Sequence, residues 1–313
     1  MGKSSPILYI VGPTAAGKTS YAEHLATLIP AEIINMDIGQ LYRPLSIGTA
    51  KPVLASYTVP HHLFDIFDTP QSLTVVAYAH MLQAIIPHVH ERGNYAMVVG
   101  GSAFYLTSLF FPLQRQSMET SAHRATEDDA MASTLWDQLN MIDPERARAI
   151  APADVYRLKR ALALWHATGK PPSLYKPHFA PLFANTHIIL VTRDRDDLYQ
   201  RINSRIQSML QAGWLDEIER IKGTEWELFV REKNIIGYPE LLDYVHGIDR
   251  RPLQEIVAVI SQKTRQYAKR QIIFFRRLQR LLAQEQYPGS TVLNLTHDDP
   301  QRYNENLMKH ILG

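Results

Sequence analysis

The chain has 313 residues, of which 45% are hydrophobic and 20% are charged, and its formal net charge is +2. These values are typical of a globular protein with a large core, organised as one domain with an insertion or as two domains. The absence of cysteine excludes disulfides, thiolate zinc sites and a cysteine nucleophile. No run reaches the ~18 apolar residues of a membrane helix, and we expect a cytoplasmic protein.

The first predicted strand, residues 7–11, ends at a glycine-rich stretch that is followed by apolar residues at helical spacing. The stretch fits G-x-x-x-x-G-K-[ST] at every fixed position and reads Gly12-Pro13-Thr14-Ala15-Ala16-Gly17-Lys18-Thr19. Strand, loop and helix in this order let backbone N–H groups and a helix N-terminus surround phosphate oxygens. We expect Lys18 to reach the terminal phosphates and the Thr19 hydroxyl to bind Mg²⁺. The pattern predicts a di- or triphosphate ligand and leaves the reaction open.

The second predicted strand, residues 31–37, ends at Asp37. A carboxylate at the end of a parallel strand points into the ligand crevice, although a helix N-cap or a turn is an alternative role. Residues 38–52 are rich in turn formers and polar groups and predict a substrate-facing loop. His61 and His62 lack the spacing of a metal-binding pair, so packing or a polar contact is the favoured role.

A helix at 74–92, which Pro87 interrupts or kinks, precedes a third strand at 95–99. This strand runs into Gly100-Gly101-Ser102, where an ATPase usually has an acid that holds Mg²⁺ or positions water. The lack of that acid argues against simple nucleotide hydrolysis. Paired glycines at a strand end allow close backbone approach to a ligand.

The pattern changes near Leu113, where polar residues precede two predicted helices within 135–150 and 153–169. A strand at 186–192 and a helix near 195–212 follow, and Arg201 and Arg205 lie one turn apart on that helix. We therefore predict an α/β fold with a P-loop NTPase-like parallel sheet. The core comprises residues 1–113 and 183–313, and residues 114–182 form an inserted all-helical domain.

The last long helix, about 253–284, is rich in basic residues. Four of them fall within about 60° of each other and form a stripe of about 22 Å: Arg265, Lys269, Arg276 and Arg280. Apolar residues fall roughly opposite and should pack on the body: Ile260, Tyr267, Phe274, Phe275, Leu278 and Leu282. The stripe can follow phosphates, and a solvated face is the alternative.

Three functions fit these residues. The first is a small-molecule kinase with Asp37 as base, and the second is a nucleic-acid-dependent NTPase. The third is a transferase in which the P-loop holds a diphosphate that leaves.

The chain resembles the tRNA dimethylallyltransferase family, also called tRNA isopentenyltransferase. The resemblance covers nearly the whole chain and depends on an ordered set of motifs: GPTAAGKT, MDIGQLY, IGTAKP, HHLFDI, GGSAFYLTSL, ADVYRLKRALALWHATGKPPS, IIGYPE and TRQYAKRQ. It implies transfer of a dimethylallyl group from dimethylallyl diphosphate to N6 of the adenine 3′ of the anticodon, in tRNAs that read codons beginning with U. It also implies a monomer that needs Mg²⁺ and spends no ATP.

The resemblance assigns roles to particular residues. Asp37 matches the general base, and Thr19 and Arg205 face the pyrophosphate. Residues that match tRNA-binding positions are Asp37, Ile38, Gly39, Gln40, Ser102, Arg124, Tyr156, Arg157, Lys159, Arg160, Asn234, Gly237 and Tyr238. The insertion would grip the anticodon stem-loop, and Arg265, Lys269 and Arg276 would meet the tRNA backbone.

The chain departs from the family pattern near the acceptor, at Ile38, Ser102, Tyr156, Ala163 and Pro239. These positions usually hold Ser, Thr, Gln, an acid and Lys, so the departures leave room for an altered tRNA preference. A relative that prenylates AMP to make cytokinin is the nearest alternative. The insertion and the basic helix argue against it, because a free nucleotide needs neither.

Overall fold

The computed structural model describes residues 5–54, 58–112, 129–175 and 178–312. The chain divides into two compact units. The first comprises residues 1–107 and 182–313, and the second comprises residues 108–181.

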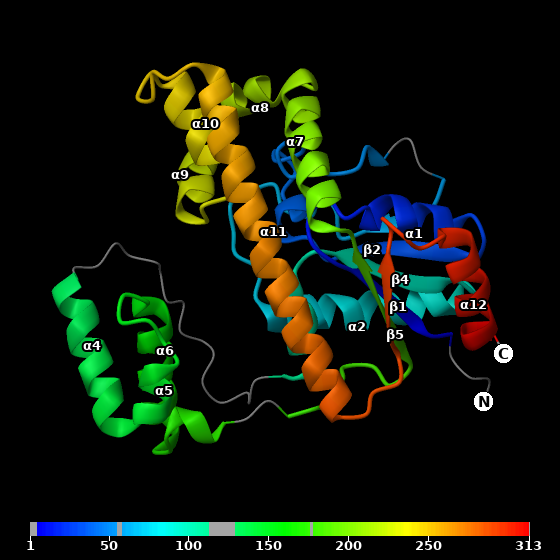
Figure 1. Ribbon diagram of the computed structural model, residues 1–313, viewed down its shortest axis with the longest axis horizontal. Helices are drawn as coiled ribbons and strands as arrows, with labels where there is room; N and C mark the ends of the chain where they lie inside the picture. Colours follow the sequence, from blue (N-terminus) through cyan, green and yellow to red (C-terminus); the bar gives the residue numbers. More distant parts are fainter. Residues whose placement is uncertain (1–4, 55–57, 113–128, 176–177, 313) are drawn as a thin grey trace. The chain divides into compact units, whose positions relative to one another are not determined.

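The first unit is built on a parallel sheet (Figure 1). Its strands are β1 (Ile7–Val11), β2 (Ala31–Asn35), β3 (His61–His62), β4 (Tyr95–Gly100), β5 (Thr186–Thr192) and β6 (Ser290–Asn294), in the spatial order β3-β2-β4-β1-β5-β6. Every residue of β1, β2 and β4 is buried. Continuous burial is typical of parallel strands that are covered on both faces, and the predicted α/β sheet is confirmed.

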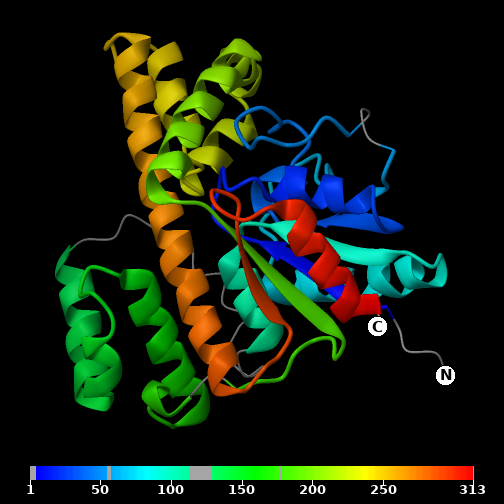
Figure 2. The ribbon, with the colours of Figure 1, turned by 45° about the vertical axis from the view of Figure 1, so that its right-hand side comes forward.

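Helices cover this sheet and extend beyond it. They are α1 (Lys18–Ala26), α2 (Val75–Glu91), α3 (Ala103–Phe110), α7 (Arg195–Gln211), α8 (Trp214–Ile221), α9 (Glu225–Glu232), α10 (Tyr238–Val245), α11 (Leu253–Gln284) and α12 (Pro300–Leu312), with a short 3₁₀ helix η1 (Ile38–Leu41). The unit boundary falls within α3. Helices α7 to α10 gather around the N-terminal half of α11 in both views (Figures 1 and 2).

The second unit is helical, with α4 (Asp129–Ile142), α5 (Pro144–Arg148), α6 (Val155–Thr168) and the 3₁₀ turn η4 (Pro172–Leu174). It has its own apolar cluster, formed by Leu139, Ala147, Ile150, Leu158, Ala161 and Leu162. The prediction of one helix within residues 135–150 is wrong, because α4 ends at Ile142 and α5 begins at Pro144. The Asp143 carboxylate accepts from the N–H groups of Arg146 (3.0 Å) and Ser173 (2.6 Å) and so caps α5.

Two further expectations differ from the structure. Pro87 does not interrupt α2, which continues to Glu91 with Ile86 and Val89 buried on either side of the proline. Tyr267 on α11 is 38% exposed and does not pack in the core, whereas Phe275, Leu278 and Leu282 do.

Candidate active site

The glycine-rich loop lies at the carboxyl end of β1, and α1 starts within it at Lys18. Ala15 has a left-handed φ of 62°, a conformation that helps successive N–H groups turn toward one point. The Lys18 ammonium donates to the Pro13 carbonyl at 2.9 Å. A cavity of about 610 Å³ opens here, and its lining includes Thr14, Ala15, Gly17, Lys18, Thr19, Asp37, Gln40 and Arg205.

Asp37 follows β2 and is held by its neighbours. Its carboxylate accepts from the Gly39 N–H at 3.2 Å, and its own N–H donates to the Asn35 side chain at 2.7 Å. Burial raises the pKa of Asp37, and the positive charges of Lys18 and Arg205 only partly offset this rise. A carboxylate with a raised pKa is better suited to accept a proton near neutral pH than an ordinary one.

Lys18 and Arg205 are the cations that face Asp37. Burial lowers the pKa of Lys18 to about 8, and the charge of Asp37 acts in the opposite direction. Burial also lowers the pKa of Arg205. The Arg205 guanidinium donates to the Thr14 hydroxyl at 3.4 Å, so α7 reaches the loop.

Two further arginines hold the loop in place, and neither was predicted to have a role at the site. Arg201 donates to the Ala15 carbonyl at 3.0 Å, and Arg193 donates to the Ala16 carbonyl at 2.9 Å. Arg201 could have been recognised in the sequence, because it lies one helical turn from Arg205. Arg193, which comes directly after β5, had the same kind of position as Asp37 after β2.

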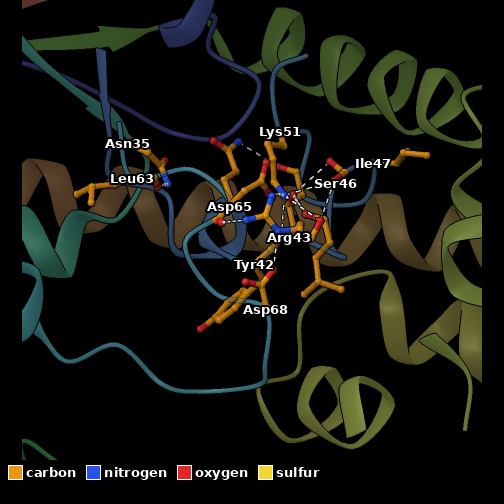
Figure 3. Close-up of polar contacts among 12 residues, drawn as sticks. Asn35, Tyr42, Arg43, Ser46, Ile47, Lys51, Leu63, Asp65 and Asp68 are labelled. Atoms are coloured by element: carbon orange, nitrogen blue, oxygen red, sulfur yellow. Dashed lines mark hydrogen bonds and ion pairs between the residues drawn. The ribbon is translucent and has the colours of Figure 1, made fainter. Parts of the chain in front are cut away.

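The loop between β2 and β3 forms another wall of the cavity, to which Thr49, Ala50 and Pro52 contribute. The Gln40 amide donates to the carbonyls of Thr49 (3.2 Å) and Ala50 (3.1 Å). Lys51 turns inward, where its side chain is 3% exposed and pairs with Asp65 (Figure 3). Its ammonium also donates to the Tyr42 carbonyl at 2.7 Å, so Lys51 holds the loop closed on itself.

Glu217 of α8 fixes the turn that precedes Thr49. Its buried carboxylate accepts from the N–H groups of Ser46 (2.8 Å), Ile47 (2.7 Å) and Gly48 (3.1 Å). It also accepts from the Tyr238 hydroxyl at 2.7 Å. One carboxylate thus joins the IGTAKP segment to the IIGYPE segment, which are about 190 residues apart in the chain.

Other predicted tRNA-binding residues of the first unit lie near these walls. Asn234 is exposed in the turn before α10, whereas Gly237 is buried and Tyr238 is fully buried. Ile38 and Gly39 belong to η1 and are half-buried. Ser102 is half-buried, and its carbonyl accepts from the Leu106 N–H at the start of α3.

Gly100, which ends β4, and Gly101, which follows it, make close contacts with the protein itself. A Cβ at Gly100 would lie 2.3 Å from the Met36 backbone, and a Cβ at Gly101 would lie 2.6 Å from Nε2 of Gln271. Both distances are too short for a side chain. The glycines therefore let β2 and α11 approach this turn.

The basic face of α11 is partly paired. Lys269 and Arg276 are exposed, whereas Arg265 is half-buried and donates to the Asn203 side chain at 2.9 Å. Nearby, Lys263 forms an ion pair with Glu240. Tyr267 as a whole is 38% exposed, but its hydroxyl is buried, and this burial, followed by the charge of Asp37, raises the pKa of the hydroxyl.

The remaining predicted residues lie in or near the second unit. Tyr156, Arg157, Lys159 and Arg160 are on α6. The Tyr156 hydroxyl accepts from Arg160 at 3.4 Å, and Arg157 lies 3.3 Å from Asp154. Arg124 lies outside the described residues.

The two histidines each contact a neighbouring protein group. His62 contacts the buried Glu32 at 2.6 Å, and His61 contacts the Val59 carbonyl at 2.7 Å. Among residues 5–54, 58–112, 129–175 and 178–312, no group of three or more His, Asp or Glu side chains could hold a metal ion. Across the same residues, no helix combines the length and apolar character needed to cross a membrane.

Comparison with known proteins gives consistent results. The IPP transferase family model matches residues 40–278. The chain is 41% identical over 277 residues to the tRNA dimethylallyltransferase of Lacticaseibacillus casei, covering 86% of this chain and 88% of that protein. It is 37% identical over 286 residues to the Bacillus subtilis tRNA dimethylallyltransferase, covering 87% and 88%.

Solved structures agree in fold. The full-length tRNA isopentenylpyrophosphate transferase of Bacillus halodurans matches with a TM-score of 0.66 and 31% identity, over 99% of this chain and 96% of that one. A eukaryotic dimethylallyltransferase acting on tRNA matches with a TM-score of 0.75 and 25% identity, over 98% and 77%. On this agreement of sequence and structure, the chain belongs to the IPP transferase family.

Proposed function

We propose that this protein transfers a dimethylallyl group from dimethylallyl diphosphate to N6 of the adenine 3′-adjacent to the anticodon, in tRNAs that read codons beginning with U. The observation that carries the proposal is the meeting of Asp37, Lys18 and Arg205 beside the P-loop. This arrangement supports the proposal, because a carboxylate that can act as base lies near cations that can stabilise a leaving pyrophosphate.

The reaction follows from these groups. The N6–carbon bond forms as the carbon–oxygen bond to the diphosphate breaks, and the N6 proton passes to the Asp37 carboxylate. An exocyclic amine is a weak nucleophile, so removal of its proton in the transition state accelerates the step. Negative charge that gathers on pyrophosphate is stabilised by Lys18, Arg205 and the loop N–H groups.

A Mg²⁺ ion fits the same site. The Thr19 hydroxyl lines the cavity, and one oxygen of Glu23, one helical turn later, is buried there without a hydrogen-bond partner. Magnesium prefers oxygen ligands and usually keeps substrate phosphates and water in its shell, so a site with few protein ligands suits it. When bound, the ion would neutralise charge on the diphosphate.

The acceptor side of the proposal uses the other predicted residues. Because an adenine in a stacked anticodon loop cannot enter a cavity, it must be flipped out of the stack. Asp37 to Gln40 and Ser102 border the space proposed for the flipped base. Tyr156, Arg157, Lys159 and Arg160 of the second unit would grip the stem-loop, and Lys269 and Arg276 would meet phosphates. In this proposal the buried Gly237 and Tyr238 shape the turn that presents Asn234.

The protein would act as a cytoplasmic monomer.

An AMP acceptor is the second candidate, because a flipped adenosine and AMP carry the same base. The exposed basic face of α11 and the separate helical unit favour tRNA over AMP. A kinase is less well supported, because β4 ends in Gly100-Gly101 and not in an acid.

The test is mass spectrometry of an acceptor after incubation with dimethylallyl diphosphate and Mg²⁺. One tube holds unmodified tRNA, a second holds AMP, and a third holds ATP without the prenyl donor. We expect a prenyl mass gain on tRNA alone, and Asp37→Asn should abolish the gain while tRNA binding persists. Gain on AMP alone would identify a cytokinin-forming enzyme, and phosphate release from ATP would indicate a kinase or NTPase.

A further inference from the structure

Gln271 of α11 bonds two turns beside the candidate active site, although it is not among the residues that line the cavity. Its Oε1 accepts from the Thr14 N–H at 2.8 Å, and its Nε2 donates to the Gly101 carbonyl at 2.8 Å. The residue is 5% exposed. Its two partners are 257 and 170 residues away in the chain.

These two hydrogen bonds determine how the P-loop can meet a diphosphate. A backbone N–H is a single donor, so the Thr14 N–H that serves Gln271 is not available to a phosphate oxygen. Thr14 is left with its hydroxyl, which already accepts from Arg205. The Ala16 N–H already donates to the Pro13 carbonyl at 3.3 Å. Phosphate binding by backbone N–H groups therefore depends on the other loop residues after Thr14, in the geometry that Gln271 helps to fix.

Packing alone does not explain a glutamine at this position. A buried amide is costly unless its donor and acceptor are both used, and an apolar side chain would fill the same space more cheaply. The Gln271 amide also lies very close to Gly101. A Cβ at Gly101 would lie 2.6 Å from the Gln271 Nε2 and 3.7 Å from the Lys18 ammonium. Both ends of the amide thus act on backbone that borders Lys18.

We infer that Gln271 is a positioning residue for the donor diphosphate: it holds the start of the P-loop to the Gly100-Gly101 turn and so sets the shape of the phosphate cradle. This inference rests on the proposed function of the loop. It also means that α11 carries residues of two kinds. Its exposed cations face solvent, and Gln271 fixes the loop from within.

The experiment compares Gln271→Met, which keeps the length of the side chain and removes both hydrogen bonds, with the unmodified protein. Titration calorimetry with inorganic pyrophosphate and Mg²⁺ gives donor-site affinity, and a filter assay gives tRNA affinity. We expect the pyrophosphate Kd and the KM for dimethylallyl diphosphate to rise about tenfold, as loss of buried hydrogen bonds implies. The tRNA Kd and kcat should change less than about twofold. The control is Gln254→Leu, which changes an exposed glutamine of the same helix.

A second variant, Gly101→Ala, disturbs the same contact from the other side. If it acts through Gln271, its effect on pyrophosphate affinity should largely vanish in the Gln271→Met background, because coupled residues are not additive. Unchanged pyrophosphate affinity in folded Gln271→Met would overturn the inference. If that variant does not fold, unchanged affinity in Gly101→Ala would overturn it. Failure of the unmodified protein to bind pyrophosphate would instead count against the proposed function.

Discussion

The pKa values of Lys18 and Asp37 shift in opposite directions. Burial disfavours the charged form of both groups, and the two groups carry opposite charges. Burial raises the pKa of Asp37 and lowers the pKa of Lys18 to about 8, while each charge partly relieves the cost of burying the other. In the proposed reaction the free enzyme has an ionised Asp37 and a protonated Lys18. We therefore expect catalysis in the pH range between the two pKa values.

We predict a bell-shaped dependence of kcat/KM on pH, since this ratio reports groups of the free enzyme. Activity should fall as acid protonates Asp37, and it should fall again as pH rises through about 8 and Lys18 loses its proton. Lys18→Arg keeps its charge at high pH, so the alkaline fall should move beyond the measurable range. Steady-state rates between pH 5 and pH 10 would check this, and an unchanged alkaline limb in that variant would assign the limb to another group.

Among individual residues, the sequence predicted Lys18, Asp37 and Arg205 and did not predict the side chains that hold backbone groups in place. Lys18, Asp37 and Arg205 stand at strand ends or at helical spacing beside a known motif, and such positions can be recognised along the chain. Gln271 and Glu217 act on backbone groups at least 169 residues away, so their partners are visible only after folding. A single polar residue within a long amphipathic helix carries no local sign of such a role.

Among the elements, the turn before α10 depends on close contact with α8. Gly237 has a φ of 94°, and a Cβ there would lie 2.2 Å from the Trp214 ring. Gly247 also has a positive φ, of 68°, but a Cβ there would meet nothing within 4 Å. Substitutions at both glycines would strain the backbone, but only a substitution at Gly237 would also cause steric overlap. Comparing the two therefore isolates the cost of the overlap.

We predict that Gly237→Ala destabilises the protein by about 1–3 kcal/mol more than Gly247→Ala does, because added volume in a packed core costs about this much. Chemical denaturation monitored by circular dichroism would give both free energies of unfolding. Equal losses in the two variants would mean that Trp214 moves aside at little cost.

Helix α11 offers an element-scale test of tRNA binding. Reversing the exposed charges with Lys269→Glu and Arg276→Glu should weaken tRNA binding and make the plot of log affinity against log salt shallower by about 1–2 units. Binding measured from low to moderate salt would give the slope. The matched control is Arg302→Glu on the exposed face of α12, and an unchanged slope in the α11 variants would make that stripe an ordinary solvated face.

The elements themselves were predictable where their signal was strong. The bounds of β1, β5 and α11 match the expected ranges. The two strands are continuous apolar runs and the helix has a long amphipathic pattern, and such signals define where an element begins and ends. The edge strands β3 and β6 were not predicted. β3 has two residues, and within β6 Leu293 alone is buried, so neither segment shows an apolar pattern.

The whole molecule combines two units that would contact one large ligand. In the proposed complex, Lys269 of the first unit and Arg157 of the second meet different parts of the same tRNA. Contacts without shared partners usually contribute additively to binding free energy. Lys269→Glu and Arg157→Glu together should therefore multiply their separate losses of tRNA affinity, as measured at one fixed salt concentration. A double variant that binds no more weakly than the worse single variant would show that both act on one contact.

The burial of Trp214 between two turns gives the protein an internal optical probe. Its ring is 1% exposed and meets the backbone of Gly48 on one side and of Gly237 on the other. Indole emission shifts toward longer wavelengths when water reaches the ring, so it reports whether these turns stay together. The chain has four tryptophans, and replacing the other three with phenylalanine would leave this one as the sole emitter. A change of its emission on tRNA addition would then report on the turns at Gly48 and Gly237 separately from the chemical step.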